Sequence, residues 1–269
     1  MNIIKQSKFL KGLNDRESLK RLKENYLRNL NYAKKIQMAL LPQTPPETEQ
    51  YNFEFYYSPA EIIGGDIYDI KFYRDQYVIF YLADVAGHGV PAAMLTVFAK
   101  QSLETTTKIL NKEILNSPMQ ALKKLNEKLV DANFEGNPQV TIFYCIYSIE
   151  DKTLTYSSAG HHPAVLLRET EEKLIFFGKP SVPLGWFKDI KIYEDNIQLQ
   201  SGDKIIIFTD GLFENLPVKG DEYDFICNVL LKNKDLSLNK IIKKLITERN
   251  KVSPDYQDDD IAILGFNVK

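Results

Sequence analysis

The sequence predicts an α+β protein in which antiparallel β-sheets are covered by helices that are segregated from the strands. Short runs rich in aromatic and β-branched residues follow one another along the chain, and many are separated by Gly, Pro, Asp or Asn, which favour turns. Segments with helical periodicity return in pairs between these groups of strands. Because a parallel βαβ sheet would alternate strands with helices, the grouped strands indicate antiparallel pairing.

The expected elements take up most of the chain after residue 46. The strands are predicted at residues 51–57, 67–72, 77–84, 140–148, 153–158, 165–168, 173–177, 190–199, 204–209 and 261–267. The helices of the same region are predicted at residues 90–110, 118–132, 223–232 and 236–250. Tyr and Phe, 15 of each, lie mostly in the strands, so we expect them to form the core.

A long N-terminal helix is predicted over residues 15–41. This segment contains no Gly or Pro, and its apolar residues recur every three or four positions, namely Leu19, Leu22, Tyr26, Leu30, Ala33, Ile36 and Leu40. Such a stripe packs either on its own domain or against a partner helix, and periodicity alone does not separate these two roles. Because prolines follow and end the helix, we place a boundary between residues 1–46 and residues 47–269.

The overall composition excludes several classes of function. Lys and Arg total 34 and Asp and Glu total 36 of the 269 residues, so the formal net charge is −2. A nearly neutral chain is not attracted as a whole to nucleic acid or to an anionic membrane. The longest apolar runs are far shorter than a membrane span, and the N-terminal residues lack the apolar core of a signal peptide. We therefore expect a cytoplasmic protein with no nucleic-acid partner and no membrane span.

Cysteine and histidine are too scarce to suggest a thiol-based or imidazole-based metal site. Cys145 and Cys227 lie in apolar stretches and are expected to be buried thiols. The chain has three histidines, which argues against a histidine-rich zinc site. Two of them, His161 and His162, are adjacent and are expected to shape a loop.

Aspartates mark the edges of four strand-like runs. Asp66, Asp84 and Asp210 each lie at such an edge, and residues 258–260 precede the last apolar run. A carboxylate at the end of a buried strand costs free energy unless something compensates it. Each segment taken singly is more typical of a turn, since Asp next to Gly is common turn chemistry. Four such segments together favour a shared pocket.

Convergence of these segments would call for divalent cations. Carboxylates in one pocket repel and raise one another's pKa values, and two divalent cations would cancel that charge. Oxygen ligands favour magnesium or manganese over zinc or copper. Two such ions about 3.5–4 Å apart can share a water and activate it for attack on a phosphoryl group. The pattern therefore predicts hydrolysis of a phosphate ester without a Ser or Cys nucleophile from the protein.

The motifs resemble those of the metal-dependent protein phosphatases, the PPM or type 2C family, in its RsbU/SpoIIE-like branch. They occur in the family's order: AxxIQxxLLP at 33–42, PAxxIGGDxYD at 59–69, ADVxGHGxxAA at 83–93, SAGH at 158–161, PLG at 183–185, FTDG at 208–211 and DDI at 259–261. Each motif alone is weak, but the ordered set is highly specific. The resemblance implies a sandwich of two antiparallel β-sheets flanked by helices, preceded by an N-terminal helical extension.

The resemblance also implies the chemistry and the residues of the site. It implies a phosphatase domain at residues 47–269 that holds two Mn²⁺ or Mg²⁺ ions and hydrolyses phosphoserine or phosphothreonine on a protein. By the match, Asp84 bridges both ions and the backbone carbonyl of Val85 adds a ligand. Asp210 and Asp259 complete the second metal site.

Three further positions of the motifs are candidate site residues. Asp66 matches a position that binds a metal directly or through water, and Asp260 matches an acidic position beside the ligands and is a further candidate metal ligand. His88 is a candidate general acid for the leaving serine, because its unperturbed pKa lies near neutrality, although support of the glycine turn is the favoured interpretation. No arginine that would hold the substrate phosphate is evident.

The resemblance implies a partner as well. In this branch the usual substrate is a phosphorylated STAS-domain anti-anti-sigma factor. The N-terminal helix matches the linker that joins sensory modules to phosphatases of this type. We hypothesise that this helix pairs with a second copy to form a homodimer, or docks on another protein, and thereby sets the geometry of the metal site.

The sequence has features of two other classes of protein besides a phosphatase. A regulatory binding module that keeps the fold but has lost turnover is favoured by Ala262, where the family often has Thr or Ser. A diguanylate cyclase is suggested by the GGD sequence at 64–66. It fails because Ile67 and Tyr68 follow where Glu and Phe would be expected.

Overall fold

The computed structural model describes residues 16–109, 117–213, 216, 222–252 and 257–269. The chain divides into two compact units, Met1–Leu40 and Leu41–Lys269. In the first unit, the helix α2 (Arg16–Leu40) confirms the helix predicted from the apolar stripe, whose first residue, 15, lies outside the described residues. Large apolar side chains of α2 are exposed, namely Leu19, Leu22, Tyr26, Leu27, Tyr32 and Ile36.

The second unit contains two five-stranded sheets, and every strand pairs with its neighbours in antiparallel fashion. The first sheet has the order β1 (Tyr51–Ser58), β10 (Ile261–Val268), β9 (Lys204–Phe208), β6 (Ala164–Arg168), β7 (Lys173–Phe177). The second has the order β2 (Ile67–Tyr73), β3 (Tyr77–Val85), β4 (Val140–Ser148), β5 (Thr153–Ala159), β8 (Glu194–Gln198). The predicted fold class is thus confirmed.

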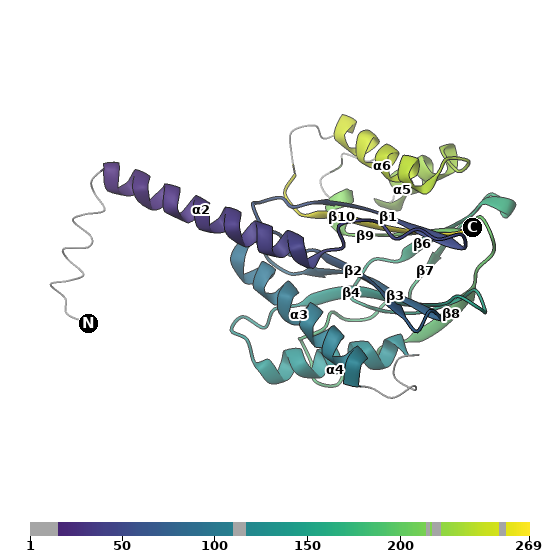
Figure 1. The fold of residues 1–269 in the computed structure, drawn as a ribbon, viewed down its shortest axis with the longest axis horizontal. Helices are drawn as coiled ribbons and strands as arrows, with labels where there is room; N and C mark the ends of the chain where they lie inside the picture. The colour runs from purple at the N-terminus through teal and green to yellow at the C-terminus, as the bar shows by residue number, and fades with distance from the viewer. Residues whose placement is uncertain (1–15, 110–116, 214–215, 217–221, 253–256) are drawn as a thin grey trace. The chain divides into compact units, whose positions relative to one another are not determined.

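Helices cover the outer faces of both sheets, as Figure 1 shows. The helices α3 (Gly89–Ile109) and α4 (Pro118–Ala132) lie on the second sheet, with contacts to β3, β4 and β5. The helices α5 (Glu222–Lys232) and α6 (Leu238–Val252) lie on the first sheet, where α6 contacts β1 and β10. Helix α4 begins where the sequence predicts, because the Ser117 side chain accepts a hydrogen bond from the Gln120 amide and Pro118 occupies the first turn.

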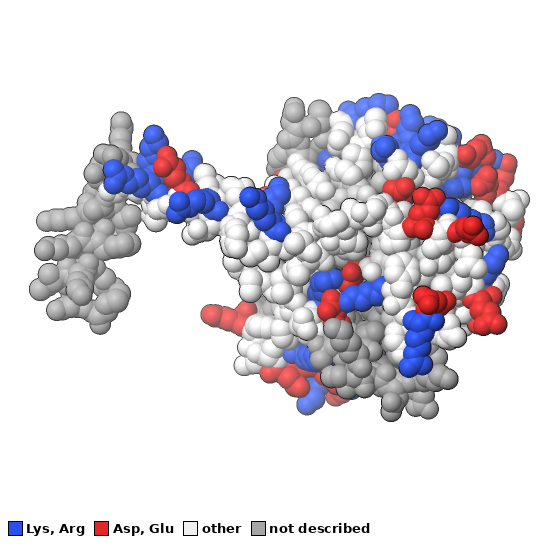
Figure 2. Space-filling view, in the orientation of Figure 1, with Lys and Arg blue, Asp and Glu red and all other residues white. Residues whose placement is uncertain are grey.

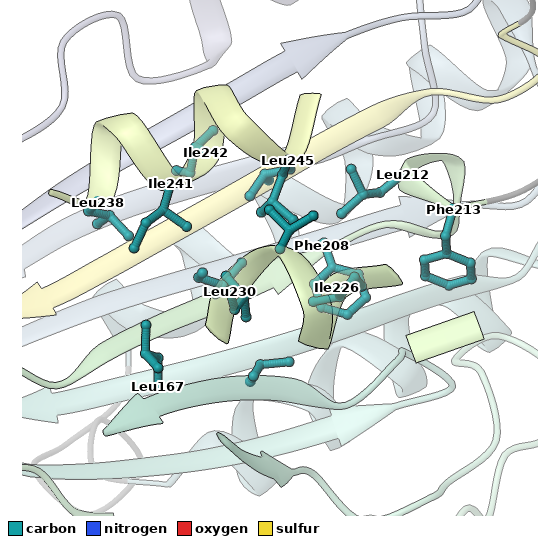
Figure 3. Packing of buried hydrophobic residues seen from close by; sticks show 14 of the residues in the cluster. Leu167, Phe208, Leu212, Phe213, Ile226, Leu230, Leu238, Ile241, Ile242 and Leu245 are labelled. Carbon is teal, nitrogen blue, oxygen red and sulfur yellow. The ribbon is translucent and has the colours of Figure 1, made fainter. Parts of the chain in front are cut away.

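Apolar side chains fill the space between the two sheets and the spaces between the sheets and their helices. Between the sheets, aromatic rings from both sides interlock, with ring centroids 5.1 Å apart for Phe53 and Phe80 and 4.9 Å apart for Tyr147 and Phe266. These four side chains are fully buried, as expected for the aromatic residues of the strands. Under α5 and α6, aliphatic side chains form a second cluster against the first sheet (Figure 3). Its labelled members include Leu230, Ile241, Ile242 and Leu245.

Element boundaries differ little from expectation, and the largest difference is at β8. A strand was expected over residues 190–199, but β8 spans only Glu194–Gln198. Residues Thr153–Ser157 of β5 pair with β8, and this pairing stops at Ser157 although β5 continues to Ala159. The last residue expected in α3, Leu110, lies outside the described residues.

The surface agrees with the near-neutral composition. On the face shown in Figure 2, acidic and basic side chains are interspersed over the second unit. Within the described part of the chain, every helix is too short or too polar to cross a membrane. Cys145 is buried, as expected, whereas Cys227 is only partly buried.

Candidate metal centre

Strand pairing brings the acidic segments to one edge of the sandwich. In the second sheet, Ile67 pairs with Ala83, which places Asp66 and Asp84 next to each other at the end of β2 and β3. In the first sheet, Ile263 pairs with Phe208, so the residues after β9 lie beside those that precede β10. Asp210 and residues 259–260 occupy these two positions, and Asp210 begins the short 3-10 helix η2 (Asp210–Leu212).

A threonine joins the two sheets at this edge. The Thr209 hydroxyl, at the end of β9, donates a hydrogen bond of 2.8 Å to Oδ2 of Asp66, which leads into β2. The same hydroxyl accepts a hydrogen bond of 2.9 Å from the backbone amide of Ala262. Thr209 is buried, so these bonds are shielded from water. The expected hydroxyl at residue 262 is missing, but the Thr209 hydroxyl lies between Ala262 and the carboxylate.

Both oxygens of the Asp260 carboxylate accept hydrogen bonds from backbone amides. Its Oδ1 accepts a hydrogen bond of 2.8 Å from the Ala60 amide, and its Oδ2 accepts hydrogen bonds from the amides of Gly65 and Asp66. A Cβ atom added at Gly64 would lie 2.2 Å from Oδ2 of Asp260, so only glycine leaves room for this contact. Asp260 therefore fixes the loop that presents Asp66.

The carboxylates of this edge raise one another's pKa values. Burial is the main cause at Asp66, whose pKa lies well above its usual range, and the charges of Asp84 and Asp260 add to the rise. Burial also raises the pKa of Asp84 to about 7, with further contributions from Asp210 and Asp259. The pKa of Asp259 is raised as well, again chiefly by burial. The structure thus brings Asp66, Asp84, Asp210 and Asp259 into one electrostatically coupled group.

The chemistry of this group fits divalent cations. Among the described residues, no lysine or arginine contributes to the pKa values of Asp66 or Asp84, so their charge is not offset by a protein cation. All side-chain donors are carboxylate oxygens, the ligands that Mg²⁺ and Mn²⁺ prefer. Within the described residues, no three Asp, Glu, His or Cys side chains already converge as a metal-binding group. The carboxylates would therefore have to turn toward an ion to bind it.

The metal loop, which we define as residues 84–89, connects β3 to α3. The backbone oxygen of Val85 lies against the chain at Gly65, where an added Cβ would be 2.6 Å from it. His88 is 82% exposed in its side chain, and its Nδ1 lies 2.9 Å from Oε1 of Glu61. The charge of His88 lowers the pKa of Asp259.

The other two histidines lie apart from the carboxylates and order a loop, as expected. Nδ1 of His161 is 3.0 Å from the carbonyl oxygen of His162. Nδ1 of His162 is 2.9 Å from the hydroxyl of Tyr223. Burial lowers the pKa of His161 to about 4, so this imidazole is neutral at physiological pH.

Asp69, the last residue of the GGDxYD motif, lies on the opposite face of the second sheet. Its Oδ2 is 2.5 Å from Nζ of Lys100 on α3 and 3.4 Å from Nζ of Lys71. Lys71 in turn lies 2.6 Å from Oε1 of Glu104. Asp69 and Lys100 are both buried. This ion-pair network attaches α3 to β2, and the sequence motif alone did not separate this role from that of Asp66.

Sequence reasoning assigned no role to Thr209 and left that of Asp260 open. Thr209 stands directly before Asp210 in the FTDG motif, and a polar residue at the end of an otherwise apolar run was the available signal. The backbone contacts of Asp260 had no signal in the sequence, because its partners at Ala60, Gly65 and Asp66 lie about 200 positions away.

Comparisons with known proteins agree with this architecture. A profile of the Stage II sporulation protein E (SpoIIE) family matches residues 74–269. The chain is 27% identical over 201 residues to phosphoserine phosphatase RsbU of Bacillus subtilis (strain 168), covering 74% of this chain and 58% of that protein. It is 23% identical over 253 residues to phosphoserine phosphatase RsbP of the same organism, covering 92% of this chain and 59% of that protein. The chain thus spans about three fifths of the length of these relatives.

Solved structures share the fold at low sequence identity. The SiaA-PP2C domain of Pseudomonas aeruginosa matches with a TM-score of 0.78 and 19% identity, covering 93% of this chain and 98% of that one. The PP2C phosphatase domain of SpoIIE from Bacillus subtilis, with a fragment of its regulatory domain, matches with a TM-score of 0.67 and 17% identity, covering 82% and 64%. RsbX in complex with magnesium matches with a TM-score of 0.63 and 19% identity, covering 84% and 99%.

Proposed function

Because the chain belongs to the Stage II sporulation protein E (SpoIIE) family of PPM-type phosphatase domains, we propose that it hydrolyses phosphoserine or phosphothreonine on a protein. We further propose that the reaction requires two divalent ions, Mn²⁺ or Mg²⁺. One observation carries the proposal: Asp66, Asp84, Asp210 and Asp259 form a coupled group whose charge no lysine or arginine among the described residues offsets. The names of RsbU and RsbP as phosphoserine phosphatases support it.

In this proposal, five groups hold the ions. Asp84 and the carbonyl of Val85 act together with Asp66, Asp210 and Asp259. Bound ions would neutralise the carboxylates, polarise the phosphate and lower the pKa of water between them. The fit rests on the oxygen donors and on their raised pKa values, which indicate that a positive charge at this place would stabilise the folded chain.

The surrounding residues orient these carboxylates. Thr209 holds one oxygen of Asp66 through its 2.8 Å hydrogen bond and leaves the other oxygen for an ion. Asp260, whose two oxygens are occupied by backbone amides, acts as a positioning residue for the Gly65–Asp66 backbone rather than as a ligand. We also propose that His88, whose side chain is exposed, donates a proton to the leaving serine.

The substrate that we propose is a phosphorylated STAS-domain anti-anti-sigma factor, in a cytoplasmic signalling system. The similarity to RsbU supports this substrate class, as does a structural match to the RsbU and RsbW domains of Rv1364c from Mycobacterium tuberculosis at a TM-score of 0.64. We also retain the proposal that α2 mediates homodimerisation, since its large apolar side chains are exposed. Sedimentation of the full chain against a chain starting at Glu47 tests it, and identical monomeric behaviour contradicts it.

A catalytically silent binding module is the second candidate, and Ala262 is the observation that favours it. The structure weakens that observation, because the Thr209 hydroxyl already hydrogen-bonds both Asp66 and the amide of Ala262. A hydroxyl therefore remains beside the carboxylates although residue 262 carries none.

Phosphate release separates the two candidates. We expect the full chain to hydrolyse para-nitrophenyl phosphate and a phosphoserine peptide when Mn²⁺ is added, and to lose both activities in EDTA. Asp84→Asn and Asp210→Asn should abolish turnover while circular dichroism remains that of the folded chain. Asp189→Asn is the matched control, because Asp189 is exposed and lies outside the coupled group. Full activity of either site variant would refute the proposed roles, and absence of any metal-dependent turnover would favour the binding module.

A further inference from the structure

An apolar groove lies beside the metal loop, between α3 and the loop that follows α4. Its volume is about 420 Å³. Val85 and Ala92 form part of its lining, together with Met94 and Phe98 of α3 and Phe134 of the loop after α4. The rings of Phe98 and Phe134 meet edge to face with their centroids 5.1 Å apart. Two separate elements of the fold therefore build this groove.

The groove and the candidate metal centre share part of their structure. Val85 lines the groove and directly follows Asp84 in the chain. A Cβ atom at Gly65 would lie 2.6 Å from the Val85 oxygen and 3.4 Å from Cβ of Ala92, another lining residue. The loop that presents Asp66 thus packs against the inner side of the groove. The groove is therefore adjacent to the chain segments that carry Asp66 and Asp84.

The lining is apolar and open to solvent. Met94 is 64% exposed and Phe134 is 37% exposed, although both are large apolar side chains. Val90, which is 42% exposed, lies four residues before Met94 on the same face of α3. Methionine adapts its shape to different apolar partners. This surface is therefore suited to an apolar side chain supplied by another molecule.

A negative charge at the groove favours a basic residue next to the bound apolar side chain. Glu135 lines the groove, is exposed, and makes no ion pair with any described residue. Its carboxylate would attract a lysine or arginine placed next to the apolar side chain. Helix geometry gives the distance from the metal loop to the groove. At 1.5 Å per residue, Met94 and Phe98 lie roughly 8–14 Å along α3 from Gly89. An extended peptide covers this span with about two to four residues.

We propose that this groove selects the phosphoprotein substrate by binding an apolar side chain two to four residues from the phosphorylated serine or threonine. A basic residue beside that side chain pairs with Glu135. This inference rests on the proposed function and specifies the sequence that the same site would accept.

Synthetic phosphoserine peptides of eleven residues test this inference on the full chain with Mn²⁺. Leucine is moved through the four positions on each side of the phosphoserine in an otherwise alanine and serine background. We expect kcat/KM to rise about tenfold when leucine lies two to four residues away on one side, and to rise again when lysine is placed beside it. Para-nitrophenyl phosphate, which has no such side chain, reports on the metal centre separately.

Variants of both walls link the preference to the groove. In Met94→Glu and Phe134→Ser, the ratio of kcat/KM for the leucine peptide to that for para-nitrophenyl phosphate should fall about tenfold. Leu231→Ser is the matched control, because Leu231 is a 43% exposed apolar residue of α5 on the other sheet. Glu135→Lys should reverse the charge preference, so that glutamate beside the leucine becomes better than lysine. A change confined to stability would not produce this reversal.

Each outcome bears on the inference. Aryl phosphate turnover without a leucine preference at any position overturns it and leaves the proposed function intact, even if no peptide is hydrolysed. Loss of self-association in Met94→Glu with an unchanged peptide ratio would assign the groove to a second copy of the chain and also overturn it. If neither substrate is hydrolysed with Mn²⁺, the proposed function itself fails.

Discussion

Replacing Asp84 by Asn should stabilise the metal-free protein at alkaline pH. The folded chain raises the pKa of Asp84 from 3.8 to about 7, chiefly through burial. Between these values the folded protein keeps a proton that the unfolded chain releases, so the free energy of unfolding decreases as pH rises through this range. Each tenfold change in the acid constant is about 1.4 kcal/mol, which gives a loss on the order of 2–4 kcal/mol above pH 7 for this coupled group.

Urea denaturation in EDTA at pH 5, 6, 7 and 8 measures this effect. The free energy of unfolding of the wild type should fall across the series, and that of Asp84→Asn should fall less, because the amide carries no charge at any of these pH values. The two proteins should differ most at pH 8. Asp189→Asn should follow the wild type, since Asp189 is exposed. Parallel curves for Asp84→Asn and the wild type would refute the argument that charge at this position destabilises the fold.

In the same urea assay, Mn²⁺ should restore the free energy of unfolding that the metal-free wild type loses at high pH. A ligand that binds only the folded state stabilises it by about 2.7 kcal/mol at one hundred times its dissociation constant. The wild type at pH 8 should gain this stability with Mn²⁺, whereas Asp84→Asn should gain much less because it lacks a proposed ligand. Equal gains for both proteins would place the ion elsewhere.

Three other predictions concern the residues around the site. Thr209→Val should lower the free energy of unfolding by about 1–3 kcal/mol in urea, because it removes the hydrogen bonds to Asp66 and from the Ala262 amide, and Thr209→Ser should restore it. Lys100→Met should lower the free energy of unfolding by about 3–5 kcal/mol, because Asp69 stays buried without its nearest cation. Adding Asp69→Asn should recover part of that loss, and strictly additive effects of the two substitutions would contradict the pairing. Reducing agents should leave phosphate release unchanged, because no thiol takes part in the proposed chemistry; inhibition by dithiothreitol would contradict this.

Much of the fold was accessible from the sequence, because local patterns determine it. The strands alternate with turn residues, and a serine followed by proline begins α4 as predicted. The extent of β8 could not be predicted, because the residue at which its pairing with β5 stops depends on the tertiary structure and not on the local pattern. The pairing of the two sheets was implied by the resemblance rather than derived from periodicity, since alternation does not say which strands are neighbours.

The candidate site could be predicted as a set of residues but not as a set of roles. Asp66 and Asp69 belong to one motif, yet one joins the carboxylate group and the other pairs with Lys100 on the opposite face. Which face a side chain takes follows from the register of β2 against β3 and from the helix that covers it. The match assigns Asp259 to a metal and leaves the role of Asp260 open, whereas hydrogen bonds from distant backbone amides make Asp260 a structural contact.

The contact of Asp260 with residues 60–66 has a consequence for biosynthesis. The strand that opens the domain, β1, pairs along its whole length with β10, which is synthesised after the other strands of the two sheets. Until those final residues emerge, the loop that presents Asp66 lacks its anchor and the first sheet lacks a central strand. We therefore expect a chain that stops before β10 to lack the phosphatase activity proposed above.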